Sequence, residues 1–212
     1  MRSPLAERER DRLIEAMLPD VAFDGWSRGA LRTAARRLVM PAEEALALFR
    51  RGAPDLVAGF SGWADRRMLD WYEAAPAESG GTTARIKRAL DLRFEVVAPW
   101  REAVRRALSV LALPPHAVLG LRLLYDTVDG IWYAAGDAST DFSFYTKRAT
   151  LAGVYTATLM YWLEDRSDDF AETRAFIDRR LADVARLGEA RGRLDAAFER
   201  LPNPFRLFRP VR

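Results

Sequence analysis

Two aspartates in the segment RLLYDTVDGIWYAAGD, residues 122–137, have the residue type and the spacing to do chemistry. Asp126 and Asp129 lie three residues apart, so a helix would place both carboxylates on one face. Paired carboxylates can transfer protons or hold a metal ion. Arg122 lies four residues before Asp126 and can neutralise it within the helix, and no helical Glu-x-x-His motif is present to build a di-iron site. We therefore expect a structural role for this pair.

The supply of ligand and nucleophile residues limits other reactive chemistry. The chain has no Cys and a single His, which excludes disulfides, thiolate nucleophiles, thiolate metal sites and His-pair metal sites. His116 follows two prolines in LALPPHAV, where a surface or helix-capping role is expected. One His allows at most one Ser-His-Asp arrangement, and an enzyme acting on small molecules is the least favoured function. We expect a protein that is not an enzyme, with no cofactor and no metal.

The elements that must position these residues are helices. Apolar residues recur at helical spacing throughout, and no run alternates as a strand would, so the fold class is expected to be all-α. We expect Pro19 to end the first helix, Ser27 to cap the second, Gly136 to end the seventh and Ser167 to cap the last. The expected helices cover residues 5–18, 28–38, 41–51, 53–75, 83–98, 100–111, 115–135, 142–165 and 168–187, with a loop over 77–83.

Three short helices before longer ones predict three regions: a helix-turn-helix-like subdomain over 1–52, a helical body over 53–188 and a tail over 189–212. Residues 28–51 hold six Arg against two Glu, which suits a DNA backbone. The helix that would read bases, PAEEALALF, offers two carboxylates that repel phosphate, and Ala and Leu that do not read base edges. The sequence therefore disfavours sequence-specific DNA binding without excluding it.

The charge and the hydropathy of the sequence indicate where in the cell the protein is expected to lie. The net charge of +3 creates no strong overall field for nucleic acid or anionic lipid. The N-terminal segment MRSPLAERERDRLIEAM has no apolar signal core and is not poor in acids, which favours a bacterial cytoplasmic protein or a mature form. No window reaches the roughly eighteen apolar residues that a membrane-spanning helix needs.

The segment DFSFYTKRATLAGVYTATLMYWLED, residues 141–165, is the most unusual in the chain. Residues 149–163 carry no charge and are apolar on every side, which predicts the central helix of a bundle. Phe142, Phe144 and Tyr145 in its first turn point in diverging directions, since adjacent helical positions differ by about 100°. At least one of them is expected to meet solvent, a ligand or a partner. One face of the remainder is shared by Leu151, Tyr155, Thr158 and Trp162.

The C-terminal segment RGRLDAAFERLPNPFRLFRPVR combines aromatic and basic residues. Residues 200–212 carry four Arg and no acidic side chain. Such a segment suits a membrane interface, but it could equally dock on its own domain, and both alternatives stay open. The residues expected to touch a membrane are Phe198, Leu201, Phe205 and Phe208.

Three parts of the sequence together resemble the Coq-nine family, the lipid-binding accessory proteins of ubiquinone biosynthesis. They are TDFSFYTKRATLAGVYTATLMYWLEDRSDDFAETRAFIDRRL, the preceding VDGIWYAAGDAS and the helix-turn-helix-like start. The pattern AGD-x-S-x-D-F-x-[FW]-Y-T-[KR]-R-A-x-L-A-G-[VI]-Y matches from Ala135 to Tyr155. The resemblance is strong over residues 118–187, and weaker but colinear outside them.

The resemblance implies a TetR-regulator-like fold with an internal cavity for an isoprenoid quinone or a phospholipid. It implies a non-catalytic protein that presents polyprenyl quinone intermediates to the di-iron demethoxyubiquinone hydroxylase. The protein would lie peripherally on the inner membrane, its C-terminal tail would contact the membrane surface, and a homodimer could form through its last two long helices. Leu151, Tyr155, Thr158 and Trp162 would then line the lipid chamber.

By the same resemblance, Asp141, Phe144 and Tyr145 would carry the surface that meets the hydroxylase, with Ile131 and Trp132 nearby. Phe144 stands where some members have Trp, and Asp141 equally suits the N-cap of its helix. TetR regulators end their reading helix in a contact series of the form L-Y-R-H-F, which here is ALALF, residues 45–49. The structural Phe remains but the DNA-contacting residue types are gone, which resembles a regulator fold used for lipid binding. The alternative function is a TetR-type ligand-responsive DNA-binding regulator.

Overall fold

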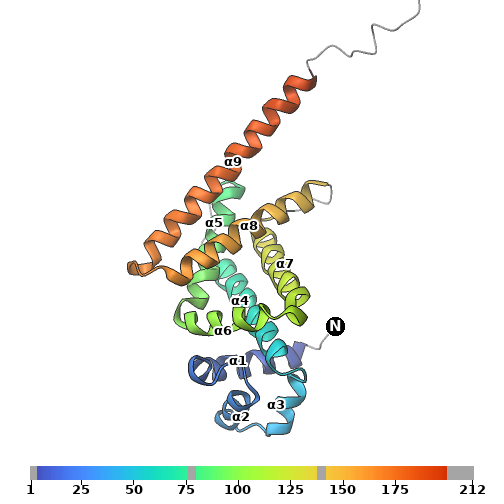
Figure 1. Cartoon of the computed structure of the whole chain (residues 1–212), viewed down its shortest axis with the longest axis vertical. Coiled ribbons are helices and arrows are strands. Elements are labelled where there is room, and N and C mark those ends of the chain that lie inside the picture. The colour runs from blue at the N-terminus through green and yellow to red at the C-terminus, as the bar shows by residue number, and fades with distance from the viewer. Residues whose placement is uncertain (1–3, 76–79, 138–141, 200–212) are drawn as a thin grey trace, which may run out of the picture.

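The computed structural model describes residues 4–75, 80–137 and 142–199, with side chains over 4–75, 80–137 and 144–186. Every regular element in these ranges is helical, so the expected all-α class is confirmed (Figure 1). Three single-turn 3₁₀ segments join some of the α-helices. The α-helices of the described ranges are α1 (Pro4–Asp24), α2 (Arg28–Arg37), α3 (Ala42–Leu48), α4 (Ala53–Ala74), α5 (Thr82–Val97), α6 (Arg101–Leu111), α7 (Ala117–Ala134), α8 (Phe142–Glu164) and α9 (Ala171–Glu199).

The helices α1 to α3 pack together at one end of the molecule (Figure 1). Ser27 caps α2 as expected, because its hydroxyl accepts a hydrogen bond from the backbone N–H of Ala30 at 3.1 Å. The expectation that Pro19 ends the first helix is wrong, since α1 continues through it to Asp24. Burial of the apolar face on both sides of the proline, up to Val21, offsets the hydrogen bond that Pro19 cannot donate.

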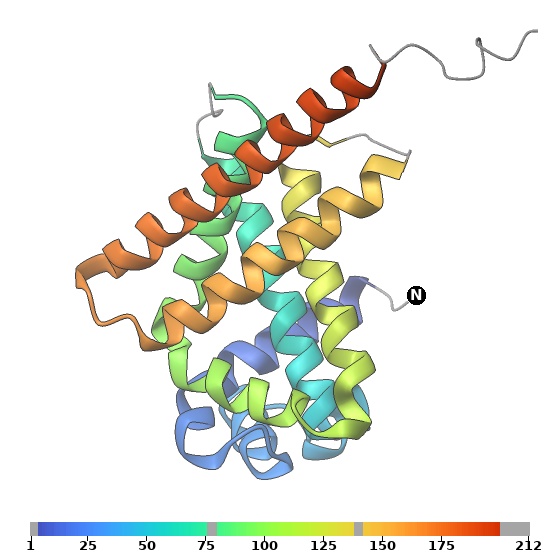
Figure 2. The same cartoon turned by 45° about the horizontal axis from the view of Figure 1, so that its top comes forward.

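The helices α4 to α9 form the larger body. Gly136 ends α7 as expected: its φ of +77° is unstrained only for glycine, and the N–H of Asp137 bonds back to the carbonyl of Trp132 at 3.1 Å. The central helix is α4, which packs against α1, α5, α6 and α7. Figure 2 shows α8 and α9 crossing the outside of this group.

The expectation that residues 149–163 form the central helix is therefore only half right. One face of α8 is buried, including Leu151, Tyr155 and Trp162. Its opposite face is exposed and consists of Ala149, Thr150, Gly153, Thr156, Ala157 and Met160. These side chains are mostly small or hydroxylic, so their exposure to water costs little, and the absence of charge does not require burial.

Asp165 joins α8 to α9. One carboxylate oxygen accepts from the backbone N–H of Ser167 at 2.8 Å and the other from that of Thr173 at 2.8 Å. Burial alone would raise the pKa of Asp165, but the hydrogen bonds from Ser167 and Thr173 lower it to about 2. Ser167 also caps the start of α9 as expected, since its hydroxyl accepts from the N–H of Glu172 at 3.0 Å.

The last helix is longer than expected. The sequence predicts its end at about Leu187, but α9 continues to Glu199, beyond the predicted start of the tail at residue 189. Ala, Leu, Arg and Glu dominate this extension, and their helix propensity outweighs the cost of about 1 kcal/mol for each of Gly188 and Gly192. The far end of α9 extends past the other helices (Figures 1 and 2).

No single helix in the described ranges has both the length and the apolar character needed to cross a membrane. One pair, Thr82–Leu111 with Pro114–Ala134, meets the same criteria jointly, with a bend of 101° between its halves.

Candidate functional site

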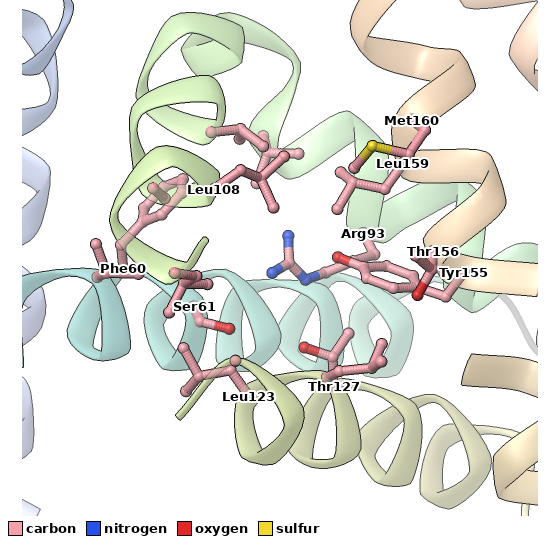
Figure 3. Close-up of a pocket in the computed structure, with 17 residues that line it drawn as sticks. Phe60, Ser61, Arg93, Leu108, Leu123, Thr127, Tyr155, Thr156, Leu159 and Met160 are labelled. Atoms are coloured by element: carbon pink, nitrogen blue, oxygen red, sulfur yellow. The ribbon is translucent and has the colours of Figure 1, made fainter. Parts of the chain in front are cut away.

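The body contains a cavity of about 230 Å³, called here the central cavity, to which α4, α5, α6, α7 and α8 each contribute (Figure 3). Its wall is apolar except for Arg93 and the hydroxyls of Ser61, Thr127, Tyr155 and Thr156. Pockets of this character bind apolar or amphipathic small molecules. The other lining residues are Val57, Phe60, Val97, Val104, Ala107, Leu108, Leu111, Gly120, Leu123, Leu124, Leu159 and Met160.

A buried polar group forms one side of the central cavity. The guanidinium of Arg93 donates from Nε to Asp65 at 2.8 Å, and the hydroxyl of Thr127 donates to the same carboxylate at 3.0 Å. Burial lowers the pKa of Arg93, but negative charge on Tyr155, present only at the high pH where that phenol ionises, and on Asp65 raises it above the ordinary value, so Arg93 stays protonated. Burial raises the pKa of Tyr155, which is therefore a neutral phenol at physiological pH.

A second cavity of about 420 Å³, called here the α9 cavity, lies between α5, α8 and α9. Trp132 of α7 closes one side, and Lys147 is the only charged residue in the part of its wall that the structure describes. The remaining lining residues are Thr82, Thr83, Ile86, Thr146, Thr150, Leu151, Val154, Leu181, Val184 and Ala185.

The four residues expected to line a lipid chamber divide among three environments. Tyr155 lines the central cavity and Leu151 lines the α9 cavity. Thr158 and Trp162 are fully buried and line neither. Trp162 lies near the end of α8, where Phe94 and Phe170 pack against its ring and the guanidinium of Arg101 lies 5.2 Å from the ring centre. Their shared helix face correctly predicted that all four residues are buried. It could not predict which of them lie at a cavity, because that depends on where the neighbouring helices leave space between them.

The residues expected to meet a partner form a compact group at the start of α8 and the end of α7. Tyr145 is 69% exposed, and its ring meets the edge of Phe144 with the ring centres 5.1 Å apart. Ile131 is fully buried and Trp132 nearly so, so both side chains lie beneath this surface rather than on it. Asp141 lies outside the described residues.

Arg148 holds these two helix ends together. Its guanidinium stacks on the Phe144 ring, 3.4 Å from the ring centre, and contacts Asp129 at 2.6 Å and Asp137 at 3.4 Å. The sequence reasoning missed this network because its partners lie on different helices. It did predict the pairing of Arg122 with Asp126, which is present at 3.7 Å.

Tyr133 is a surface residue that the sequence reasoning missed. It is 70% exposed and follows the buried Trp132. Adjacent helical residues point about 100° apart, so an inward Trp132 could have indicated an outward Tyr133. We call the exposed rings of Tyr133 and Tyr145, with the half-buried Phe144, the aromatic patch.

The N-terminal helices keep the features that disfavour DNA reading. The two carboxylates Glu43 and Glu44 are exposed in the first turn of α3, which has only seven residues. Phe49 is fully buried, with the guanidinium of Arg10 4.0 Å from its ring centre. Its role is structural, as the sequence indicated.

The predictions about metal ligands and about the membrane-contacting tail concern residues outside the two cavities. Within the described side chains, no group of three or more His, Cys, Asp or Glu is arranged to hold a metal ion. Phe198 lies in α9, in the part whose side chains are not described, and Leu201, Phe205 and Phe208 lie outside the described residues. The membrane contact of the tail therefore stays a prediction.

Comparison with solved structures gives the fold. The crystal structure of the TetR transcriptional regulator from Nitrosomonas europaea superimposes with a TM-score of 0.67 at 24% identity, over 84% of this chain and 98% of the regulator. The TetR-like fold expected from the sequence is thus confirmed. A likeness at this identity concerns the fold alone.

Comparison with known sequences gives the relatives. The COQ9 family model matches residues 117–188. The ubiquinone biosynthesis protein COQ9, mitochondrial, of Xenopus tropicalis is 33% identical over 86% of this chain and 59% of its own length. The rat and human proteins of the same name are 32% and 31% identical, each over 92% of this chain and over 64% and 63% of their own lengths.

This chain spans about 60% of the length of these relatives. Their names place them in mitochondria, which disagrees with the bacterial location expected from the sequence. The match over α7, α8 and the start of α9 coincides with the pattern from which the resemblance was drawn, and the similarity continues over most of the chain. The chain is therefore similar to the COQ9 proteins over most of its length, and the family model itself matches α7, α8 and the start of α9.

Proposed function

We propose that this protein is a non-catalytic, lipid-binding accessory protein of ubiquinone biosynthesis that presents a polyprenyl quinone intermediate to the demethoxyubiquinone hydroxylase. The observation that carries the proposal is the apolar central cavity inside a body whose relatives are named for ubiquinone biosynthesis. A long isoprenoid chain in water costs roughly 25 cal/mol for each Å² of exposed apolar surface. A protein that moves such a lipid therefore has to cover it with an apolar wall.

The position of the aromatic patch supports presentation to a partner. The patch lies on α7 and α8, and the same two helices supply part of the wall of the central cavity. Exposed aromatic rings on a rigid support are typical of interface hot spots. Arg148 provides that rigidity, because it fixes Phe144 against Asp129 and Asp137.

Mass spectrometry of lipids that copurify with the native protein tests the proposal. We expect an isoprenoid quinone intermediate. If the protein is produced in a different organism, a phospholipid of that organism is expected in the same cavity. Protein that carries no lipid, and binds none from vesicles containing a polyprenyl quinone, would refute it. The proposed location is peripheral, on the membrane that holds the quinone intermediates.

The alternative, a ligand-responsive DNA-binding regulator, has only the fold in its favour. The exposed carboxylates of Glu43 and Glu44 oppose it, because phosphate repels them. A salt-sensitive and sequence-selective gel shift with the DNA upstream of its own gene would establish that function instead.

A further inference from the structure

We propose that the central cavity recognises the polar head of its ligand, and that this head is an uncharged ring bearing a carbonyl or phenolic oxygen that accepts a hydrogen bond from Arg93. This inference rests on the proposed lipid-binding function and adds to it the residue that recognises the head and the orientation of the ligand in the cavity. The head would lie inside the body at Arg93, with the apolar chain along the remaining wall.

The first support is the position of Arg93. Arg93 is only 5% exposed. Figure 3 shows its guanidinium projecting into the space between Leu108, Leu159 and the ring of Tyr155. Its Nε is used by Asp65. Within the described residues neither Nη group donates a hydrogen bond to the protein, so two donors of a charged group face the cavity. A ligand oxygen in the cavity would give these N–H groups an acceptor in place of water, in a charge-assisted hydrogen bond.

The second support is the charge balance of the wall. Among the described residues, Arg93 is the only charged one that lines the central cavity, and Asp65 already compensates it at 2.8 Å. An anionic head group such as a phosphate would add an uncompensated charge to a buried site, which is strongly unfavourable. A neutral acceptor such as a quinone carbonyl gains the charge-assisted hydrogen bond without that cost.

The third piece of evidence is that neighbouring residues hold Arg93 in a fixed orientation. Asp65 is held by the hydroxyl of Thr127 at 3.0 and 3.1 Å to its two oxygens, so α4, α5 and α7 jointly fix the direction of the guanidinium. The ring of Tyr155 lies beside Arg93, with its hydroxyl toward the guanidinium (Figure 3). A flat head ring could stack beside this phenol while its oxygen meets the Nη groups.

The test compares three ligands that each carry one long alkyl or acyl chain but have different heads. Decyl-substituted benzoquinone and decylbenzene share a chain, but only the first has ring oxygens. Lysophosphatidylglycerol supplies the anionic head. Calorimetric titration of the full chain should give a quinone affinity at least about 10-fold higher than that of either other ligand, which is a typical effect for a hydrogen bond from a charged donor.

The variant is Asp65→Asn with Arg93→Met, which removes the ion pair as a unit and avoids an unpaired buried carboxylate. We expect its quinone affinity to fall about 10- to 100-fold and its decylbenzene affinity to stay constant. Arg88→Met, on the same helix but outside the cavity wall, is the matched control and should bind like the wild type. If the double variant does not fold, Arg93→Lys keeps the ion pair but loses the forked donor, and should show a smaller loss.

Three results would overturn the proposal. An unchanged quinone affinity in the folded double variant, or equal affinities of the wild type for quinone and decylbenzene, would reject head recognition while lipid binding stands. Tighter binding of lysophosphatidylglycerol would assign the site to an anionic lipid. Failure of the wild type to bind any of the three would remove the proposed function together with the inference.

Discussion

Asp91 on α5 is a carboxylate whose environment makes stability depend on pH. It lies among two ion pairs between α5 and α9, Lys87 with Asp178 at 2.5 Å and Glu95 with Arg174 at 3.0 Å. Burial raises its pKa from 3.8 to about 6, although Lys87 and Arg174 act in the opposite direction. Between those two pH values the folded chain keeps a proton that the unfolded chain has released. The free energy of unfolding therefore falls as pH rises from about 4 to about 6.

Asp91→Asn should remove this pH dependence. We expect the melting temperature to rise by a few degrees at pH 7, since roughly 1 kcal/mol corresponds to about 2–4 °C in a domain of this size. At pH 4 the wild-type side chain is already protonated in the folded state, so the variant should show no gain there. Melting curves from pH 4 to pH 8 check this. A constant difference across the range would contradict the buried-carboxylate explanation.

Tyr145 is the residue through which the proposed partner contact is most directly tested. Tyr145→Lys places a charge at an exposed aromatic position without disturbing the core, and should weaken hydroxylase binding by about 2 kcal/mol, as expected for a hot spot. Tyr125→Lys is the matched control, because Tyr125 is an exposed tyrosine of α7 outside the aromatic patch. Pull-down or calorimetry measures both. Wild-type affinity in a folded Tyr145 variant would move the contact elsewhere.

At the scale of the elements, local signals decided where helices begin and end. Ser27→Ala should destabilise the chain by about 0.5–2 kcal/mol, because the N–H of Ala30 loses its acceptor at the start of α2. Ser109→Ala is the control, since the exposed Ser109 hydroxyl bonds only to a carbonyl of its own helix. Chemical denaturation of both variants gives the comparison. Equal stabilities would mean that water replaces the cap at no cost.

The sequence predicted helix existence and several caps correctly because these depend on residues within one turn. Ser27, Gly136 and Ser167 act through hydrogen bonds to neighbouring backbone groups, so their roles can be read from spacing. The continuation of α1 past Pro19 depends instead on burial against other helices. A local rule that assigns a helix end to every interior proline cannot include that free energy.

The candidate site was predictable to a smaller extent, for a related reason. Periodicity placed Tyr155 and Trp162 on one buried face, but only the packing of five helices leaves space beside Tyr155 and closes it around Trp162. Arg93 was not singled out, because a single arginine in an amphipathic helix has no sequence signature of burial. Its ion pair with Asp65 joins residues on α4 and α5 that only the tertiary structure brings together.

At the scale of the whole molecule, the predicted membrane contact of the tail can be tested by removing it. Deletion of residues 190–212 should abolish cosedimentation with anionic vesicles, because it removes Phe198, Leu201, Phe205 and Phe208 together with the terminal arginines. Quinone binding in the central cavity should persist, since no lining residue is removed. Full vesicle binding by the shortened chain would assign the tail to another role.

Light scattering of both forms would also test the predicted homodimer.

The extension of α9 past the other helices has a geometric meaning if the tail does rest on a lipid surface. At a rise of about 1.5 Å per residue, the segment 187–199 forms a rod about 20 Å long. A rod of that length acts as a strut: it sets the height of the cavity above the bilayer and restricts the angle of approach. Insertion of a whole number of helical turns would then change that height while preserving the rotational phase of the tail. Such a series would report the transfer distance that a lipid has to travel.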